Sequence, residues 1–243
     1  VTDDTDRVRE LVLDELERGT TQVLLEWPAD GTAGAASGDG LVDHLDRCLD
    51  GVYLDLATIA IDAGGREPDV AAALVELAGR RGVDPAALQL VVGFDPVGRW
   101  LRSAGNHDLG DGIDATIELV RWSADDRPGV VPLAIDAALV HEAGGGDVEE
   151  LGTSLAIGAH LLRAMVDAGV DVDVAARALE FRYAATPDQF TTIAKLRAAR
   201  RTWQRVAQVA GASVPAQRQR QHAASSRAAM TRYDPWVNLL RGT

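Results

Sequence analysis

A histidine and a cysteine stand one helical turn apart near the start of the chain, a spacing that metal sites use. His44 and Cys48 fall within residues 41–49, where the apolar pattern predicts a short helix. A zinc site needs about four such donors, and nothing nearby in the sequence supplies the others. Cys48 is the only cysteine of the chain, which excludes an internal disulfide and a cysteine-rich zinc site. We therefore expect no metal site.

Three consecutive glycines, Gly144 to Gly146, precede a helix predicted at 147–168. Free backbone amides at the start of a helix can hold a phosphate. The triplet lacks the spaced glycines and the lysine of a nucleotide-binding loop. We interpret it as a tight turn between a strand and a helix, with Asp147 as the helix cap and Glu150 three residues further on.

Positive charge is concentrated at the carboxyl-terminal end of the chain. Residues 195–243 hold ten Lys and Arg against one acid, Asp234, whereas the whole chain carries a net charge of -13. Such an end could bind nucleic acid, a phosphorylated cofactor or an acidic partner, or it could be a solvated helix face that pairs with the acidic remainder. Few aromatic residues there could stack on bases, so we do not expect nucleic acid as a partner.

Residues 179–203 contain one complete switch from strand to helix. Residues 179–183 alternate between apolar and charged side chains, which predicts a strand. Thr186 is expected to cap the following helix, with Pro187 in its first turn and Gln189 completing a capping box. Apolar residues at helical spacing predict a packed face, and the basic residues are expected on other faces. The apolar set is Ile193, Leu196, Trp203 and Val206, and the basic set is Lys195, Arg197, Arg201 and Arg205.

The same apolar periodicities and capping residues, followed along the whole chain, predict six strands alternating with helices. The strands are expected at 21–27, 52–57, 88–94, 129–137, 179–183 and 214–220, and the helices at 6–18, 41–49, 69–80, 114–122, 147–168, after 186 and from 231. Loops are expected at 28–40 and around 106–108. This alternation favours parallel strands with crossover helices, and a (β/α)8 barrel would need two more units. We therefore predict one α/β domain, an incomplete TIM-type barrel of about six βα units completed by residues absent from this chain.

Nothing in the sequence indicates a membrane or an export signal. No apolar run approaches the length that crosses a bilayer, and the first six residues are acidic where a signal peptide would be basic. The single cysteine fits a reducing compartment. We expect a soluble, cytoplasmic protein with no membrane partner.

Three segments together carry a resemblance to a known family. Phe190-x-x-x-Ala194-Lys195-Leu196-Arg197-Ala198-Ala199-Arg200-x-x-Trp203 resembles the barrel domain of the adenosylcobalamin-dependent methylmalonyl-CoA mutase family. Two further segments are similar to it: Glu142-Ala143-Gly144 with Glu150 and Leu155-Ala156-x-Gly158, and Arg220-x-His222 with Ser226, Thr231, Asp234, Asn238 and Arg241. The resemblance implies that residues 1–243 form part of a TIM barrel.

At the positions where the resemblance implies substrate contacts, this chain departs from the family. Leu139 replaces a histidine that donates to the thioester carbonyl, and Ala178-Leu179-Glu180 replaces an Arg-Leu-Ser run that holds coenzyme A. Ala224 stands where the family has a glutamine, and Gly93-Phe94-Asp95 stands where the family has a Gln-Asn-Asp run. An aliphatic side chain cannot donate a hydrogen bond, and a carboxylate repels phosphate.

All these positions are expected on the active face of the barrel, so we expect no catalytic residue here. We expect side chains, Glu180 and Phe94 among them, to fill the space around Leu139, Ala178 and Ala224. His141, His222 and Arg220 would remain as a vestigial polar site.

The family resemblance also implies what accompanies this chain. It is similar to the small, non-catalytic subunits of heterodimeric mutases, which isomerise methylmalonyl-CoA and succinyl-CoA and stabilise a catalytic large subunit that holds adenosylcobalamin. His107 to Gly110 matches the end of the family's cobalamin-binding Asp-x-His-x-x-Gly pattern, but Gly105 stands where the Asp should be. We therefore expect no cofactor in this chain, with the first barrel strand and the carboxyl-terminal cobalamin domain absent. A homo-oligomer is possible without the large subunit, and a competent acyl-CoA mutase barrel using His141 or His222 is the alternative.

Overall fold

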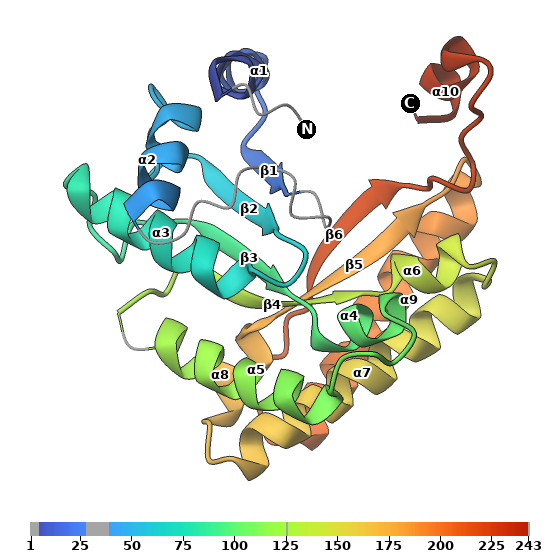
Figure 1. Cartoon of the computed structure of the whole chain (residues 1–243). Helices are drawn as coiled ribbons and strands as arrows, with labels where there is room; N and C mark the ends of the chain where they lie inside the picture. Colours follow the sequence, from blue (N-terminus) through green and yellow to red (C-terminus); the bar gives the residue numbers. More distant parts are fainter. Residues whose placement is uncertain (1–4, 28–38, 125, 243) are drawn as a thin grey trace. The chain divides into compact units, whose positions relative to one another are not determined.

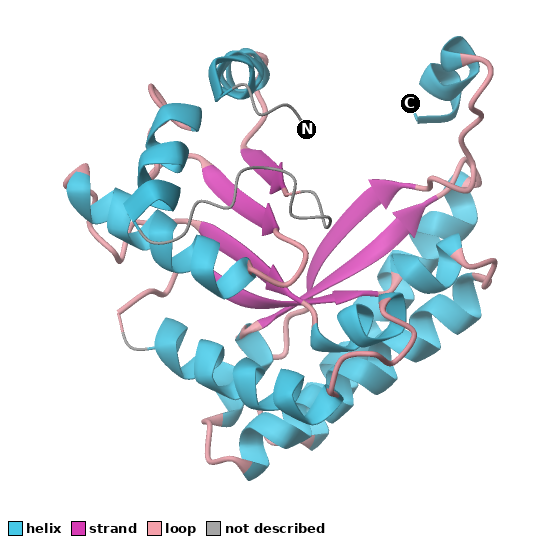
Figure 2. Cartoon of the chain, viewed as in Figure 1, coloured by secondary structure: helices cyan, strands magenta, loops and turns pink. Residues whose placement is uncertain are grey.

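The computed structural model describes residues 5–27, 39–124 and 126–242, and strands alternate with helices along them (Figures 1 and 2). The strands are β1 (Gln22–Glu26), β2 (Thr58–Asp62), β3 (Leu90–Phe94), β4 (Val130–Asp136), β5 (Leu179–Ala185) and β6 (Arg220–Ser225). The helices are α1 (Thr5–Glu17), α2 (Asp39–Cys48), α3 (Glu67–Arg80), α4 (Pro96–Arg102), α5 (Leu109–Ala124), α6 (Ala138–Glu142), α7 (Asp147–Asp167), α8 (Val172–Arg177), α9 (Gln189–Val209) and α10 (Pro235–Gly242).

The six strands lie in the sheet in the order in which they occur in the sequence. The pairs β1–β2, β2–β3, β3–β4 and β5–β6 are registered in parallel. Sequential parallel strands joined by helices are the topology of an α/β barrel, and eight such units would close one. The predicted fold class, an incomplete α/β barrel with parallel strands, is therefore confirmed.

The chain divides into two compact units. The first holds residues up to 94 together with 121–133, and the second holds 95–120 together with the residues from 134 onward. Within the described ranges, no helix combines the length and the apolar character needed to cross a membrane.

The first unit is built around strands that are buried on both faces. All five residues of β3 are buried, and one residue from each of three neighbouring strands, Ala60, Val91 and Val131, forms a common cluster. Parallel strands covered on both faces read as continuous apolar runs, which is the pattern of Ile59-Ala60-Ile61 in β2.

The prediction of a strand at 52–57 is wrong, because this segment forms a turn. The amides of Leu56 and Ala57 both donate to the carbonyl oxygen of Tyr53, and the strand follows directly as β2. Val52 and Leu54 are buried but Leu56 is 76% exposed, so the apolar alternation of this segment does not continue along one buried strand face. The other strand and helix predictions in this unit are confirmed to within two residues, and residues 28–38 of the predicted loop lie outside the described residues.

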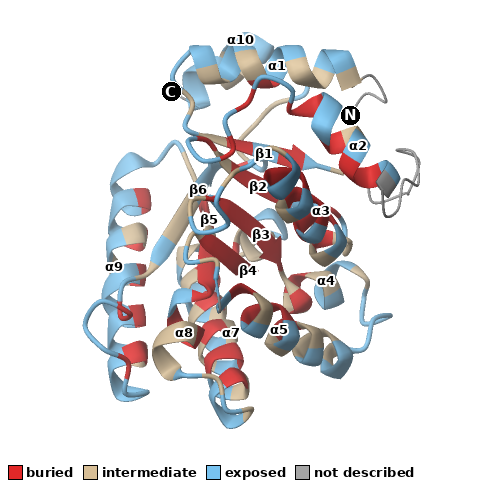
Figure 3. Cartoon of the chain, turned by 90° about the vertical axis from the view of Figure 1, so that its left-hand side faces the viewer, coloured by how far each residue is buried: buried red, intermediate tan, exposed pale blue. Residues whose placement is uncertain are grey.

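In the second unit, α7 and α9 pack together against one face of β5. The rings of Phe181 and Trp203 lie 4.8 Å apart, and Gly158 of α7 leaves the room that both rings occupy. Figure 3 shows α9 buried along one side and exposed along the other. Its buried residues recur every three or four positions, which places them on one helical face: Thr192, Lys195, Ala199, Trp203 and Ala207.

Several boundaries in this unit differ from the predictions because capping occurs at other residues. The cap of α9 is Asp188, which accepts from the Thr191 amide, whereas the predicted cap Thr186 contacts Thr192 instead. The cap of α7 is Gly146, whose amide donates to Glu149, so Asp147 is not the cap. The glycine triplet does form a tight turn, but it joins two helices, α6 and α7.

Other differences come from short elements and from the carboxyl-terminal end. The short helices α4, α6 and α8 were not predicted, and α5 begins five residues before its predicted start. The last strand is Arg220–Ser225 rather than 214–220, because residues 214–217 form turns. The last helix begins at Pro235 rather than Thr231, since the Asp234 carboxylate accepts from the amides of Trp236 and Val237.

Candidate functional site

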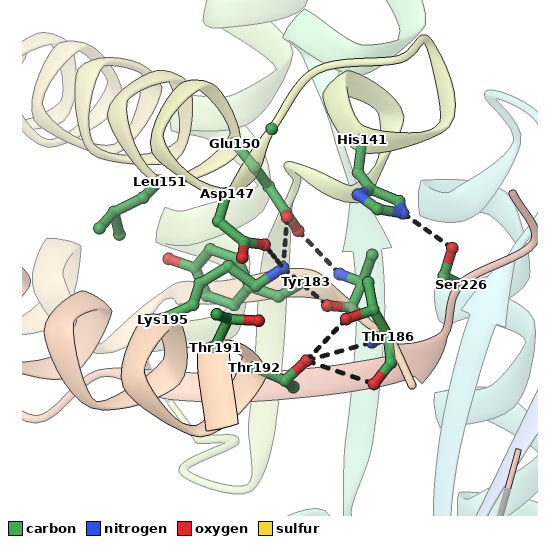
Figure 4. Close-up of polar contacts among 12 residues, drawn as sticks. His141, Asp147, Glu150, Leu151, Tyr183, Thr186, Thr191, Thr192, Lys195 and Ser226 are labelled. Carbon is green, nitrogen blue, oxygen red and sulfur yellow. Dashed lines mark hydrogen bonds and ion pairs between the residues drawn. The ribbon is translucent and has the colours of Figure 1, made fainter. Parts of the chain in front are cut away.

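The second unit buries a pair of opposite charges, Lys195 of α9 and Glu150 of α7, close to the end of β5 (Figure 4). Lys195 Nζ donates to Glu150 Oε2 at 2.5 Å and to the Ala184 carbonyl oxygen at 2.8 Å, and it lies 2.8 Å from Asp147 Oδ1. Glu150 Oε1 in turn accepts from the Ala184 amide at 2.7 Å. The Lys195 and Glu150 side chains are 1% and 0% exposed, and only Asp147, at 35%, reaches solvent, so the buried pair holds three elements together.

The prediction that Lys195 lies on a face of α9 other than the packed one is therefore wrong. Its position in the sequence carried a usable signal, because it falls in line with Ala199, Trp203 and Ala207 at helical spacing. A lysine within an apolar stripe predicts a buried carboxylate partner, since an unpaired buried ammonium costs several kcal/mol.

A second polar cluster joins α6 to the segment after β6. His141 Nε2 lies 2.7 Å from Ser226 Oγ, and the buried Ser226 also accepts from the Ala229 amide. Next to it, Glu142 accepts from the Arg227 amide at 2.8 Å. These contacts occupy His141, and they are made just beyond the carboxyl ends of the strands, where α/β barrels carry their active sites.

A third cluster lies around the end of β4 and the start of α4. Asp95 caps α4 by accepting from the Gly98 amide at 2.8 Å, and its other oxygen accepts from the Asp136 amide at 3.2 Å. Burial raises the pKa of the Asp95 carboxyl, although both amide bonds oppose the shift. Arg102 pairs with Asp136 at 2.5 Å, so the half-buried carboxylate of Asp136 is also engaged.

The face of β5 that points away from α7 and α9 carries an ion pair. Phe181 and Tyr183 point toward the helices, since Phe181 stacks on Trp203 and the Tyr183 hydroxyl bonds Ser154. Successive strand residues point to opposite faces, so Glu180 and Arg182 lie on the other face. Arg182 Nε lies 3.4 Å from Glu180 Oε1, and the two side chains are 17% and 5% exposed.

Strand β6 extends the face of β5 that points away from α7 and α9, which is the inner face of the sheet. Gln221 donates to the Leu196 carbonyl oxygen on α9, so its neighbours Arg220 and His222 point away from α9. In the parallel register Arg220 is opposite Glu180, and His222 is opposite Arg182. The inner face of β5 and β6 therefore carries one carboxylate, two guanidinium groups and one imidazole.

The structure separates the substrate-contact positions that the family resemblance implied. Ala178 precedes β5 and Glu180 is its second residue, so both lie at the amino end of that strand. Leu139 follows β4, and Ala224 lies near the carboxyl end of β6. The expectation that all of them lie on one active face is therefore wrong for Ala178 and Glu180.

The residues expected to fill this region are only partly enclosed. Ala178 and Glu180 are buried, and Leu139 is half-buried. Phe94 is also buried, as the last residue of β3 in the first unit. Ala224 is exposed among the described residues, so its surroundings are not filled as predicted.

The three polar residues expected to remain as a vestigial site do not form one cluster. Arg220 and His222 share the inner face of β6, whereas His141 is bonded to Ser226 beyond the strand end. No hydrogen bond or ion pair joins His141 to either of them in the described part of the chain.

The described residues include no group of three or more His, Cys, Asp and Glu side chains that could hold a metal ion. Cys48 Sγ lies 3.6 Å from His44 Nε2, and burial raises the pKa of the thiol, which disfavours the thiolate that binds metals. His107 lies exposed in the turn between α4 and α5, and Gly105 there adopts φ +81°. The residues of this turn do not fit a cobalamin ligand supported by a carboxylate.

These features define an α/β-barrel protein whose polar groups are largely engaged with one another. A family model described as Methylmalonyl-CoA mutase matches residues 31–243. The chain belongs to the methylmalonyl-CoA mutase family, and the resemblance seen in the three sequence segments is confirmed.

The relatives include both kinds of subunit of this family. The chain is 46% identical to the methylmalonyl-CoA mutase small subunit of Streptomyces virginiae, over 99% of this chain and 37% of that protein. It is 36% identical to the small subunit of Propionibacterium freudenreichii subsp. shermanii, over 97% of this chain and 35% of that protein. The methylmalonyl-CoA mutase large subunit of Streptomyces virginiae is 29% identical over 87% of this chain and 29% of that protein. The chain thus spans about a third of the length of the curated relatives that it matches.

Proposed function

We propose that this chain is the barrel part of the small subunit of a heterodimeric methylmalonyl-CoA mutase. The complex would isomerise methylmalonyl-CoA and succinyl-CoA in the cytoplasm, and this subunit would not catalyse the reaction itself. Its role would be to bind the catalytic large subunit and stabilise it.

The observation that carries this proposal is the ion pair between Glu180 and Arg182. Glu180 stands where the family resemblance implies a serine that contacts coenzyme A, and it lies 4% exposed on the inner face of β5. A carboxylate that is already paired with an arginine neither donates a hydrogen bond nor attracts a phosphate.

Two further features support the proposal. Leu139 offers no donor at the position implied for the catalytic histidine, and the nearby His141 is bonded to Ser226. The identity to the two small subunits exceeds the identity to the large subunit, which favours the small-subunit role.

In this proposal adenosylcobalamin, which supplies the radical chemistry of the mutase, is held by the large subunit. None of the polar clusters described above is assigned a contact with it. The residues of this chain would contribute protein-protein contacts only.

A reconstitution experiment tests the proposal. The full-length subunit and the full-length large subunit would be purified separately and assayed alone and together with methylmalonyl-CoA and adenosylcobalamin. We expect a stable one-to-one complex, turnover only when the large subunit is present, and no coenzyme A thioester binding to the small subunit. Turnover by the small subunit alone would instead establish the alternative, a competent acyl-CoA mutase barrel of altered specificity.

His222, which with His141 is one of the two candidate donors of this alternative, shares the inner face of β6 with Arg220. Arg220 and His222 lie side by side there and could approach a bound acyl group. Loss of activity of the isolated subunit in an Arg220→Ala or His222→Ala variant would then identify the residues responsible.

A further inference from the structure

The exposed surface of α9 carries positively charged side chains that pair with no acidic side chain among the described residues. The helix contains no Asp or Glu, and four of its arginines are exposed: Arg197, Arg200, Arg201 and Arg205. Among the described residues, none of the four forms an ion pair, and Arg205 donates only to the uncharged Gln208. An exposed basic helix without partners is unexpected on a chain whose net charge is -13.

Three of these arginines form a continuous stripe along the helix. Arg197, Arg201 and Arg205 are spaced four residues apart, so they lie on one side of α9, one above the other. At 1.5 Å per residue the stripe is about 12 Å long. Like charges at this spacing repel one another, so the stripe slightly destabilises the isolated helix.

The stripe ends at an apolar groove between α7 and α9. The groove has a volume of about 470 Å³ and is lined by Ala159, Leu162, Arg163, Val166, Arg205, Val206, Val209 and Ala210. Val209 is 71% exposed and Val166 is 38% exposed, so apolar surface is open to water there. Arg163 adds a fourth cation at the edge, and Asp167, one turn further along α7, does not come within ion-pair distance of it in the described structure.

We propose that the stripe Arg197–Arg201–Arg205 and this groove form a docking surface for an acidic amphipathic helix of the large subunit. This inference rests on the proposed function, and it specifies which face of the chain makes the contact. A helix that places apolar side chains in the groove would bring flanking Asp or Glu residues against the arginines. Arginine suits this role because its planar group can pair with a carboxylate through two hydrogen bonds.

Protein is favoured over nucleic acid by the character of the surface. The stripe borders open aliphatic side chains, which nucleic-acid backbones do not cover. The only aromatic residue in the part of α9 that bears the stripe, Trp203, is fully buried and cannot stack on a base.

The test measures binding between the two full-length subunits. In an Arg197→Glu/Arg201→Glu/Arg205→Glu variant we expect the dissociation constant for the large subunit to rise at least about tenfold, since like charges would now face each other. A matched control, Arg218→Glu/Arg227→Glu/Arg232→Glu, makes the same charge change at exposed positions outside α9 and is expected to bind within about twofold of wild type. Binding of the wild type should weaken as salt is raised from about 50 mM to about 500 mM, and the stripe variant should lose this dependence.

A second measurement does not depend on the variant folding. A photo-crosslinking residue at Val209 should link to a helix of the large subunit that is rich in Asp and Glu. A crosslink to a second copy of this chain, or to a part of the large subunit without acidic residues, would overturn the proposed surface.

The outcomes separate this inference from the proposed function. If wild type does not bind the large subunit, the proposed function fails. If wild type binds and the stripe variant binds equally well, only the docking surface is wrong. Stripe-dependent binding of a random-sequence DNA duplex, with no effect on subunit affinity, would assign the stripe to nucleic acid instead.

Discussion

Lys195 and Glu150 are 45 positions apart in the sequence, yet their charged atoms lie 2.5 Å apart in the interior of the second unit. Glu150 bonds the Ala184 amide and Lys195 bonds the Ala184 carbonyl oxygen, so the pair holds both polar groups of one residue at the end of β5. The sequence block that carries the family resemblance therefore includes a residue that positions helices. Its role here is structural, since both side chains of the pair are buried and bonded to the backbone of β5.

Removal of the buried cation is expected to destabilise the fold strongly. A Lys195→Met variant leaves the Glu150 carboxylate unpaired, and such a change typically costs about 3–5 kcal/mol. Urea unfolding followed by tryptophan fluorescence measures the loss. Arg200→Met on the exposed side of α9 is the matched control and should cost less than about 0.5 kcal/mol.

A double variant distinguishes the buried charge from simple loss of packing. In Lys195→Met/Glu150→Gln the glutamine can still accept from the Ala184 amide but carries no charge. We expect this variant to be more stable than Lys195→Met alone. A double variant as unstable as the sum of the two single ones would show that the charges do not interact.

Gly158 is expected to be intolerant of any side chain. A Cβ added there would lie 2.9 Å from the Trp203 ring and 3.0 Å from the Phe181 ring, both of which are fully buried. A Gly158→Ala variant should lose about 1–3 kcal/mol through overpacking. Gly152 lies in the same helix with nothing within 4 Å of an added Cβ, so Gly152→Ala should instead gain up to about 1 kcal/mol. Equal effects at the two positions would contradict this packing.

The contact between Asp173 and Ser213 is expected to make stability depend on pH. The Asp173 carboxylate accepts from the Ser213 hydroxyl and from its amide, and these bonds, the hydroxyl first, lower the pKa of Asp173. A carboxyl whose pKa is lower in the folded state stabilises the fold above its unfolded pKa and loses that contribution as pH falls through the folded value.

Asp173→Asn should therefore lower the melting temperature at neutral pH. The difference from wild type should shrink as pH falls below the ordinary Asp value of about 3.9. Thermal unfolding across this range measures it, and a difference that stays constant with pH would contradict the assigned bonds.

Substitution of the inner-face residues of β6 is expected to leave the activity of the assembled mutase unchanged. A general acid or base typically contributes about a hundredfold or more to the rate. If this chain is non-catalytic, Arg220→Ala and His222→Ala in the small subunit should keep the turnover of the complex within about twofold. A hundredfold loss with intact assembly would place these residues at an active site.

The fold class, with parallel strands, follows from local patterns in the sequence. Apolar runs such as 90–94 and 130–136 are set by burial on both faces, and helix-length segments between them require parallel crossovers. Predictions are wrong for elements whose apolar pattern is weak or resembles that of another element type. Residues 52–57 alternate like a strand but turn back through hydrogen bonds to Tyr53, while β2 is only five residues long and contains no charged residue before Asp62.

The sequence by itself determined the number and type of most long elements and the family of the chain, because periodicity and short motifs depend on neighbouring residues. The tertiary structure decided which charged side chains are buried and which remain exposed to solvent. Lys195 and Arg197 stand two positions apart in one basic helix, but only Lys195 meets a carboxylate, because Glu150 reaches it from another helix. Burial of a charge depends on a partner distant in sequence, and only the packing of α7 against α9 brings that partner into reach.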